Sequence, residues 1–227
     1  MGVHDGHRKR LRANFIENSL TGFNDINALE LLLSFAIPRK DTNELAHILL
    51  EKFGSLKDVM LASHEELLEV PGVGENAAVL LKLVPQIYKK AALSDANTQT
   101  KCSDYDKLAN FLRPRFIDER DEVLYMVCLD NLNCVIKCIE LSRGTANYVS
   151  INIRRAVEVA ITSRACKIAL AHNHPRGPLT PSIEDDHITK QLRDALRVVD
   201  IKLVDHLIFT GGEYFSYEKY GRMNFLM

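Results

Sequence analysis

The chain has 227 residues, of which 46% are hydrophobic and 26% charged, a composition typical of soluble globular proteins and enough residues for two domains. The formal net charge of −1 excludes wholesale electrostatic binding to nucleic acid, although a local basic patch is compatible with it. Five cysteines without a Cys-x-x-Cys pair, no signal peptide and no apolar run of about 18 residues predict free thiols, no membrane partner and a cytoplasmic location.

The chain begins with a basic stretch, residues 1–12, in which Asp5 is the only acid. The stretch fits either a frayed, solvated start or an arm that contacts phosphate groups. Because Arg8, Arg10 and Arg12 cannot all lie on one helical face, the solvated start is favoured.

The sequence predicts four helices in the region that follows. They are indicated by leucine-rich apolar spacing and by helix breakers at Pro38 and Gly54. Ser63 and Glu66, three residues apart, form a capping box that starts the fourth helix. Together these features predict a small all-α domain over residues 1–93.

A tight turn at Gly72-Val73-Gly74 precedes a helix that begins with small residues. The arrangement resembles a helix-hairpin-helix, in which backbone N–H groups at the glycine turn, here Gly72 and Gly74, contact a nucleic-acid phosphate. That motif often carries a basic residue just after the second glycine, whereas this chain has Glu75 and Asn76. Since a carboxylate there should repel phosphate, DNA contact and a purely structural hairpin both stay open.

Residues 94–103 are polar and lack periodicity, which predicts a linker to a second domain, residues 104–227. In that domain, helical patterns mix with apolar strands and hairpin turns, which favours an α/β fold with a mixed sheet and packed helices. The strand that begins at Glu122 is a near-continuous apolar run, as in central strands buried on both faces. A second buried strand, residues 167–171, precedes a loop rich in proline and glycine.

The strongest chemical signal lies in that loop and the helix after it. His172 and His174 are two residues apart, so on an extended backbone both imidazoles project from one face. The loop can fold Asp185, in the first turn of the next helix, back onto them. Two imidazoles and a carboxylate make a three-ligand site with an open fourth position, the layout of a catalytic zinc centre. Ser182 and Asp185 also fit a plain helix cap, and a lone histidine pair on a strand is often structural.

This region contains the patterns His172-x-His174-Pro-x-Gly177 and Pro181-Ser182-x-x-Asp185. Together they resemble the JAMM (MPN-plus) metalloprotease motif. With Asn173 between the histidines, the pattern is similar to that of the bacterial RadC family in particular. The similarity covers nearly the whole chain, because the amino-terminal half also looks like RadC.

The resemblance implies an MPN/JAB-like fold for the second domain. It implies that Zn²⁺ is bound by His172, His174 and Asp185. It also implies that Ser182 helps to stabilise the oxyanion and that Glu122, on an earlier strand, is the general base.

Other residues compete for these roles. His187, two residues past Asp185, and His206 are further ligand candidates, but His206 beside Asp205 on a strand better fits a core histidine or one that supports a ligand. The proposed base belongs to an acidic cluster that also fits a solvated turn, and periodicity does not choose among its members, Asp118, Glu119, Asp121 and Glu122.

The sequence therefore predicts a zinc-dependent hydrolase of the JAMM type that acts on a peptide or isopeptide bond of an unidentified substrate. One alternative is a DNA-associated repair or processing protein that binds DNA through the N-terminal domain, with a metal that is structural or acts on nucleic acid. Another is a metal-binding scaffold without catalysis. The hydrolase interpretation leads because the fourth zinc position looks open and the motif is that of hydrolases.

Overall fold

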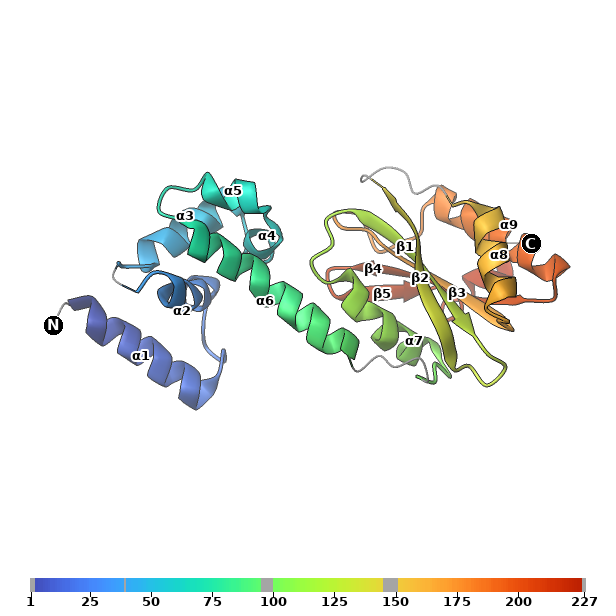
Figure 1. Ribbon diagram of the computed structural model, residues 1–227, viewed down its shortest axis with the longest axis horizontal. Coiled ribbons are helices and arrows are strands. Elements are labelled where there is room, and N and C mark those ends of the chain that lie inside the picture. The colour runs from blue at the N-terminus through green and yellow to red at the C-terminus, as the bar shows by residue number, and fades with distance from the viewer. Residues whose placement is uncertain (1–2, 39, 95–99, 145–150, 226–227) are drawn as a thin grey trace. The chain divides into compact units, whose positions relative to one another are not determined.

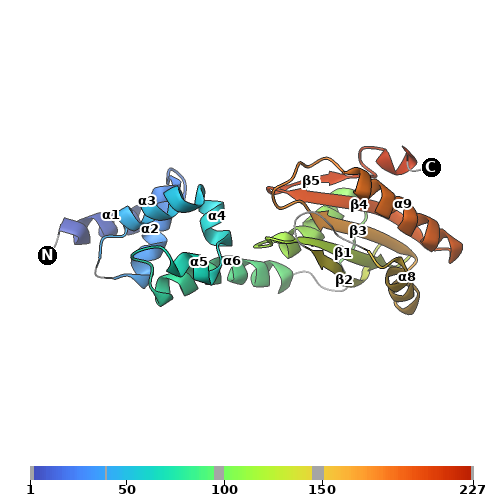
Figure 2. The ribbon, with the colours of Figure 1, turned by 90° about the horizontal axis from the view of Figure 1, so that it is seen from above.

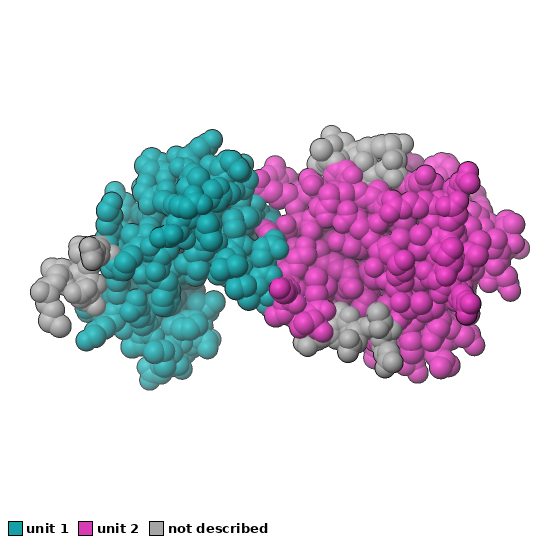
Figure 3. Space-filling model, viewed as in Figure 1, with its two compact units in different colours: residues 1–88 teal, residues 89–227 magenta. Residues whose placement is uncertain are grey.

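The computed structural model describes residues 3–38, 40–94, 100–144 and 151–225. The chain divides into two compact units, residues 1–88 and residues 89–227, which Figure 3 shows in different colours. Each unit has its own buried apolar core. Among the described residues, no helix combines the length and the apolar character that crossing a membrane requires.

The first unit is helical throughout its described part. Its helices are α1 (Val3–Asn18), α2 (Asp25–Ala36), α3 (Asn43–Phe53), α4 (Leu56–Leu61), α5 (His64–Leu68) and α6 (Glu75–Ser94), the last of which continues past the unit's final residue (Figure 1). Leucines at helical spacing, such as Leu29 and Leu33, are fully buried in a core with Leu49, Leu67 and Leu81. The prediction of an all-helical N-terminal region is confirmed.

The prediction of a frayed start, made for residues 1–12, is wrong for residues 3–12, which belong to the helix α1. The guanidinium of Arg8 donates to the carbonyl oxygen of Ile37 at 3.0 Å and also to those of Pro38 and Lys40. Carbonyl groups at the end of a helix lack intrahelical partners, and a nearby cation is favourable there. Arg8 therefore ties α1 to the end of α2, through contacts that span about 30 residues of chain.

A short turn joins α5 to α6. The predicted capping box at the start of α5 is confirmed, because the Ser63 hydroxyl accepts the Glu66 N–H at 3.2 Å and the Glu66 carboxylate accepts the Ser63 N–H at 2.7 Å. In the turn, Gly72 has a φ of +95°, a conformation that favours glycine, and Gly74 directly precedes α6. The chain here folds as a helix, a tight turn and a second helix.

The second unit is a five-stranded mixed sheet with packed helices. Its elements are α7 (Tyr105–Leu112), η1 (Arg113–Phe116), β1 (Glu122–Leu129), β2 (Val135–Gly144), α8 (Ile153–Thr162), β3 (Lys167–Asn173), α9 (Ile183–Val198), β4 (Lys202–Thr210), β5 (Glu213–Ser216) and η2 (Arg222–Phe225). The strand order is β2-β1-β3-β4-β5, as Figure 2 shows, with β3 and β4 parallel and the other pairs antiparallel. The predicted fold class is confirmed.

Apolar residues cover both faces of this sheet. On β1, Met126 and Cys128 face the core formed with α8 and α9, whereas Val127 and Leu129 face the core formed with α7. Figure 1 shows these helices on the two sides of the sheet. Because alternate residues of a strand project from opposite faces, a strand covered on both sides has apolar residues at successive positions. This explains the continuous apolar run in the sequence of β1.

The segment predicted as a linker, residues 94–103, is described only in part, because residues 95–99 lie outside the described ranges. The carbonyl of Thr100 accepts a hydrogen bond from the N–H of Val135, the first residue of β2, at 3.0 Å. The end of this segment therefore pairs with the edge of the sheet.

Candidate metal centre

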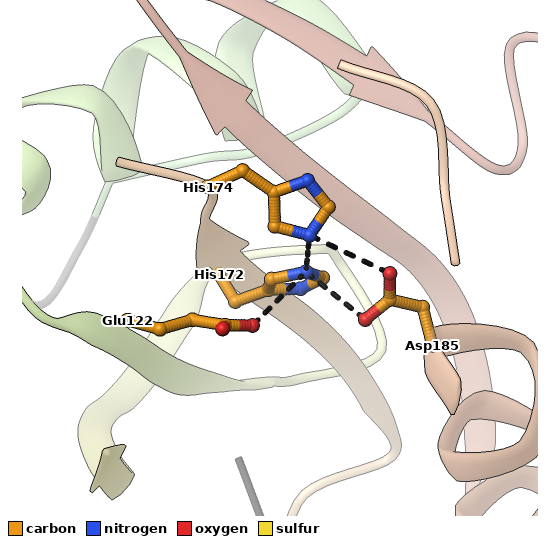
Figure 4. Close-up of side chains that lie close together, drawn as sticks. All are labelled: Glu122, His172, His174 and Asp185. Carbon is orange, nitrogen blue, oxygen red and sulfur yellow. Dashed lines mark hydrogen bonds and ion pairs between the residues drawn. The ribbon is translucent and has the colours of Figure 1, made fainter. Parts of the chain in front are cut away.

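The ends of three secondary-structure elements meet at one point of the second unit (Figure 4). Glu122 begins β1, and Asp185 lies in the first turn of α9. His172 lies near the end of β3, and His174 follows that strand. Since Leu124 pairs with His172, Glu122, two residues before Leu124, projects from the same face of the sheet. One potential ligand atom from each of the four side chains lies within 4.8 Å of the others, so the cluster could hold a metal ion.

The two histidines approach each other closely. Nε2 of His172 lies 2.9 Å from Nε2 of His174, and the side chains are 3% and 13% exposed. Nδ1 of His174 lies 2.7 Å from the carbonyl oxygen of Pro178. Because a carbonyl only accepts, the proton of His174 is assigned to Nδ1, and Nε2 faces the cluster with its lone pair. A Cβ at Gly177 would lie 3.2 Å from Cβ of His174, a close contact that would crowd the ring.

The start of α9 holds Asp185 in place. The Ser182 hydroxyl accepts the Asp185 N–H at 3.1 Å, while Oδ2 of Asp185 accepts the N–H of Ser182 at 2.8 Å and its hydroxyl at 2.7 Å. This capping box turns the carboxylate toward the histidines. Oδ1 lies 3.1 Å from Nε2 of His172, and Oδ2 lies 3.5 Å from Nε2 of His174. The same pair of residues thus caps the helix and brings a carboxylate to the imidazoles.

Burial and neighbouring charges give the two carboxyl groups different pKa values. Burial alone would raise the pKa of Asp185, but the neighbouring imidazoles of His172 and His174 outweigh it and hold that pKa well below the usual range. Burial raises the pKa of Glu122, and the two histidines offset this only in part. Asp185 is therefore kept ionised, as a metal ligand must be, whereas Glu122 takes up a proton more readily.

Glu122 is the member of the predicted acidic cluster that lies beside the histidines. Its Oε1 lies 3.8 Å from Nε2 of His172. Glu119 instead lies 2.6 Å from Nη1 of Arg143, which is also 3.8 Å from Asp121. Arg143 therefore pairs with Glu119 and Asp121, whereas Glu122 lies beside His172.

The ligand atoms fit a small divalent cation. Zinc binds nitrogen and oxygen at about 2.0–2.2 Å in tetrahedral geometry, which places neighbouring ligand atoms about 3.3–3.6 Å apart. The three contacts among His172, His174 and Asp185 measure 2.9, 3.1 and 3.5 Å, close to that spacing. The carboxylate of Glu122 stands slightly farther out. Lone pairs and negative charge that converge on one largely buried point favour a cation there, and these four side chains could bind one.

The other predicted ligand candidates have different surroundings. His187 is exposed on α9 and does not belong to the cluster. His206, on β4, is buried, and its Nε2 lies 2.9 Å from Nδ1 of His172, the ring nitrogen that does not face the cluster. The sequence did not reveal the role of Asn173, whose side chain accepts the N–H of Val123 at 2.8 Å. The only indication of this role in the sequence is that Asn173 is a polar residue at the end of a buried strand.

The residues predicted to contact nucleic acid, Gly72 and Gly74, lie in the turn before α6 of the first unit. The first residue of α6 is Glu75, whose carboxylate lies 3.0 Å from Nε2 of His64. The start of a helix carries a partial positive charge that attracts anions, and here the chain itself supplies an anion. A phosphate at this turn would meet the Glu75 carboxylate.

The chain that carries this site is similar to known proteins. Residues 102–222, more than half of the chain, match the family model of the RadC-like JAB domain. The chain is 37% identical over 226 residues to a UPF0758 protein of Fusobacterium nucleatum, and the alignment covers 96% of this chain and 97% of that protein. It is 34% identical over 202 residues to a UPF0758 protein of Ruegeria pomeroyi, and this alignment covers 89% of this chain and 90% of that protein.

Proposed function

Because this chain belongs to the RadC family, we propose that it is a zinc-dependent hydrolase that cuts a peptide or isopeptide bond. The observation that carries the proposal is the set of distances around the cluster. The side chains of His172, His174 and Asp185 approach one another to 2.9–3.5 Å, near the spacing of ligands around zinc, and the carboxylate of Glu122 stands just outside them at 3.8 Å from His172. Three protein ligands leave a fourth position for a reacting group, as in catalytic zinc sites, whereas structural sites have four.

In this proposal His172, His174 and Asp185 hold the zinc ion, which when bound acidifies water and polarises a carbonyl group. Glu122 accepts a proton from the attacking water and returns it to the leaving amine. Two observations support this role for Glu122. Its carboxylate lies 3.8 Å from Nε2 of His172, outside the closest contacts of the cluster, and burial raises its pKa, which favours the uptake of a proton.

Ser182 has two duties in this proposal. Its hydroxyl oxygen accepts the N–H of Asp185, which holds the helix start and the ligand in place. Its hydroxyl hydrogen, which points to the Asp185 carboxylate, can rotate toward a substrate oxygen and help to stabilise the developing oxyanion. The capping contact uses a lone pair of the oxygen, so that rotation leaves it intact.

Metal analysis of the purified full chain tests the proposed zinc site. We expect roughly one zinc ion per chain in the wild type and in Glu122→Gln, because Glu122 is not one of the three ligands. His174→Ala should lose most of the metal. His187→Ala is the matched control, since this exposed histidine lies on the helix that carries Asp185 but outside the cluster.

A substrate screen tests the proposed reaction. Peptides, isopeptide-linked peptides and branched DNA are incubated with the wild type, with Glu122→Gln and with the wild type plus a chelator. We expect cleavage of amide bonds that is lost in both the variant and the chelated sample. Cleavage of DNA alone would support the processing alternative, and a fully active Glu122→Gln would remove Glu122 from the role of base.

A further inference from the structure

A string of buried polar groups lies behind His172, on the side of its second ring nitrogen. The side chains of Thr189, on α9, and His206, on β4, are fully or almost fully buried. Oγ1 of Thr189 lies 2.5 Å from the backbone carbonyl oxygen of Asp185 and 2.6 Å from Nδ1 of His206. Nε2 of His206 lies 2.9 Å from Nδ1 of His172. The string thus runs from the backbone of one candidate ligand to the ring of another.

The direction of each hydrogen bond follows from the fixed end of the string. The carbonyl of Asp185 can only accept, so the single hydroxyl hydrogen of Thr189 points to it. The oxygen of Thr189 must then accept from His206, which assigns a proton to Nδ1 of His206. The backbone carbonyl of Asp185 on α9 therefore determines, through Thr189, that Nδ1 of His206 on β4 carries the hydrogen.

His206 in turn determines which nitrogen of His172 carries the hydrogen. The ring of His206 is stacked on Tyr217 at 5.0 Å between centroids, and its burial disfavours a charged imidazolium. A neutral His206 with its proton on Nδ1 has a lone pair on Nε2, which accepts the proton of Nδ1 of His172. His172 is then left with its own lone pair on Nε2, the atom that faces His174 and Asp185.

From this geometry we infer that Thr189 and His206 are positioning residues that fix the tautomer and orientation of His172 for metal binding. The inference rests on the proposed zinc site. Pro178 fixes His174 in the equivalent way, so both rings present Nε2 to the same point. The partner on the far nitrogen of a ligating histidine orients the ring and raises its basicity, and loss of such a partner typically weakens metal binding about 10–100-fold.

Zinc affinity, measured on the full chain by competition with a chromophoric chelator, tests the inference. His206→Met and His206→Gln are a matched pair of similar size, but only glutamine can offer an amide oxygen to Nδ1 of His172. We expect His206→Met to bind zinc about 10–100-fold more weakly than the wild type, and His206→Gln to stay within a few-fold. Thr189→Val, which removes the hydroxyl with little change in shape, should also weaken zinc binding.

A second measurement needs no metal. In the metal-free wild type at pH 8, nitrogen-15 NMR of the histidine rings should show the proton of His172 on Nδ1. In His206→Met the proton should move largely to Nε2. A proton on Nε2 in the wild type would overturn the inference, and this readout remains available if a variant fails to fold.

The outcomes separate this inference from the proposed function. If the wild type binds zinc and the methionine and glutamine variants bind it equally well, or lose it equally, His206 serves only to fill the core and the inference is overturned. If the wild type itself binds no zinc, the proposed function fails and the inference fails with it. Thermal unfolding of the metal-free variants shows whether a loss of affinity reflects a loss of fold.

Discussion

The side-chain amide of Asn173 hydrogen-bonds to the backbone on both sides of Glu122. Its Oδ1 accepts the N–H of Val123 at 2.8 Å, and its Nδ2 donates to the carbonyl of Asp121 at 2.9 Å. The paired residues of β1 and β3 end at Leu124 and His172, so the amide of Asn173 continues the hydrogen bonding of the two strands. The residue between the two histidines thereby holds the backbone of the carboxylate proposed as the base.

Asn173→Asp should therefore destabilise the second unit although the two side chains have nearly the same shape. The new carboxylate has no hydrogen to donate to Asp121 and places an oxygen against its carbonyl, in a site where Asn173 is only 5% exposed. A buried group that loses its partner costs about 1–3 kcal/mol. The shift of the thermal unfolding midpoint measures this, with the exposed Asn131→Asp as control. Equal shifts for both variants would contradict the prediction.

Ser182→Ala should lower both stability and zinc affinity, whereas Ser63→Ala should lower stability alone. Each serine completes a capping box, and loss of such a cap costs about 1 kcal/mol. Only Ser182 also donates to Asp185, through its hydroxyl at 2.7 Å. Thermal unfolding and chelator competition measure the two effects. A zinc affinity that is unchanged in Ser182→Ala would show that the helix start holds Asp185 without the hydroxyl.

Zinc binding should be coupled to the release of a proton from His174. Burial lowers the pKa of this histidine, but hydrogen bonds to Asp185 and Pro178 outweigh it, so the net pKa lies above the usual 6.5. Zinc must displace the proton, so below the raised pKa the affinity should fall by about tenfold per pH unit. Chelator competition between pH 5.5 and 8 measures this slope, and an affinity that is flat over the whole range would contradict the assignment.

Whereas zinc affinity should rise with pH, the contribution of His174 to the stability of the metal-free protein should fall with pH. A histidine whose pKa is raised in the folded state stabilises the fold fully below its unfolded pKa near 6.5, and this contribution is lost as pH rises through the higher folded value. The difference in unfolding free energy between the wild type and His174→Gln isolates this contribution. That difference should shrink as pH rises from 6 to 8, and a difference that grows would reverse the sign.

The parts of the site that depend on local chain geometry could be predicted from the sequence. The spacing of His172 and His174 on a strand and the three-residue spacing of Ser182 and Asp185 at a helix start bring the imidazoles and the carboxylate to one point. The mixed sheet was likewise predicted from local patterns, because continuous apolar runs and turns are local features. The order of the strands is not a local feature, and the sequence did not predict it.

The parts that depend on contacts between distant residues could not be derived from spacing. Glu122 was singled out among its acidic neighbours by resemblance alone, because its position depends on the pairing of β1 with β3 and on Arg143, which attracts Glu119. In the string behind His172, the contact between His172 and His206 joins residues 34 apart in the sequence. The tie between Arg8 and the end of α2 spans about 30 residues. Such partners follow from the fold and not from periodicity.

The two glycines of the turn before α6 should respond differently to substitution by alanine. Gly72 has a φ of +95°, and an added Cβ would lie 3.4 Å from Cδ1 of Leu45, whereas an added Cβ at Gly74 would meet nothing within 4 Å. A residue with a side chain is strained at this φ, which costs about 1–2 kcal/mol, so Gly72→Ala should destabilise the first unit and Gly74→Ala should have little effect. Thermal unfolding compares the two variants.

Binding to branched DNA at low and high salt, measured on the same variants, tests whether the turn contacts phosphate. If Gly74→Ala weakened DNA binding without loss of stability, the turn would be a contact site despite the Glu75 carboxylate that follows it.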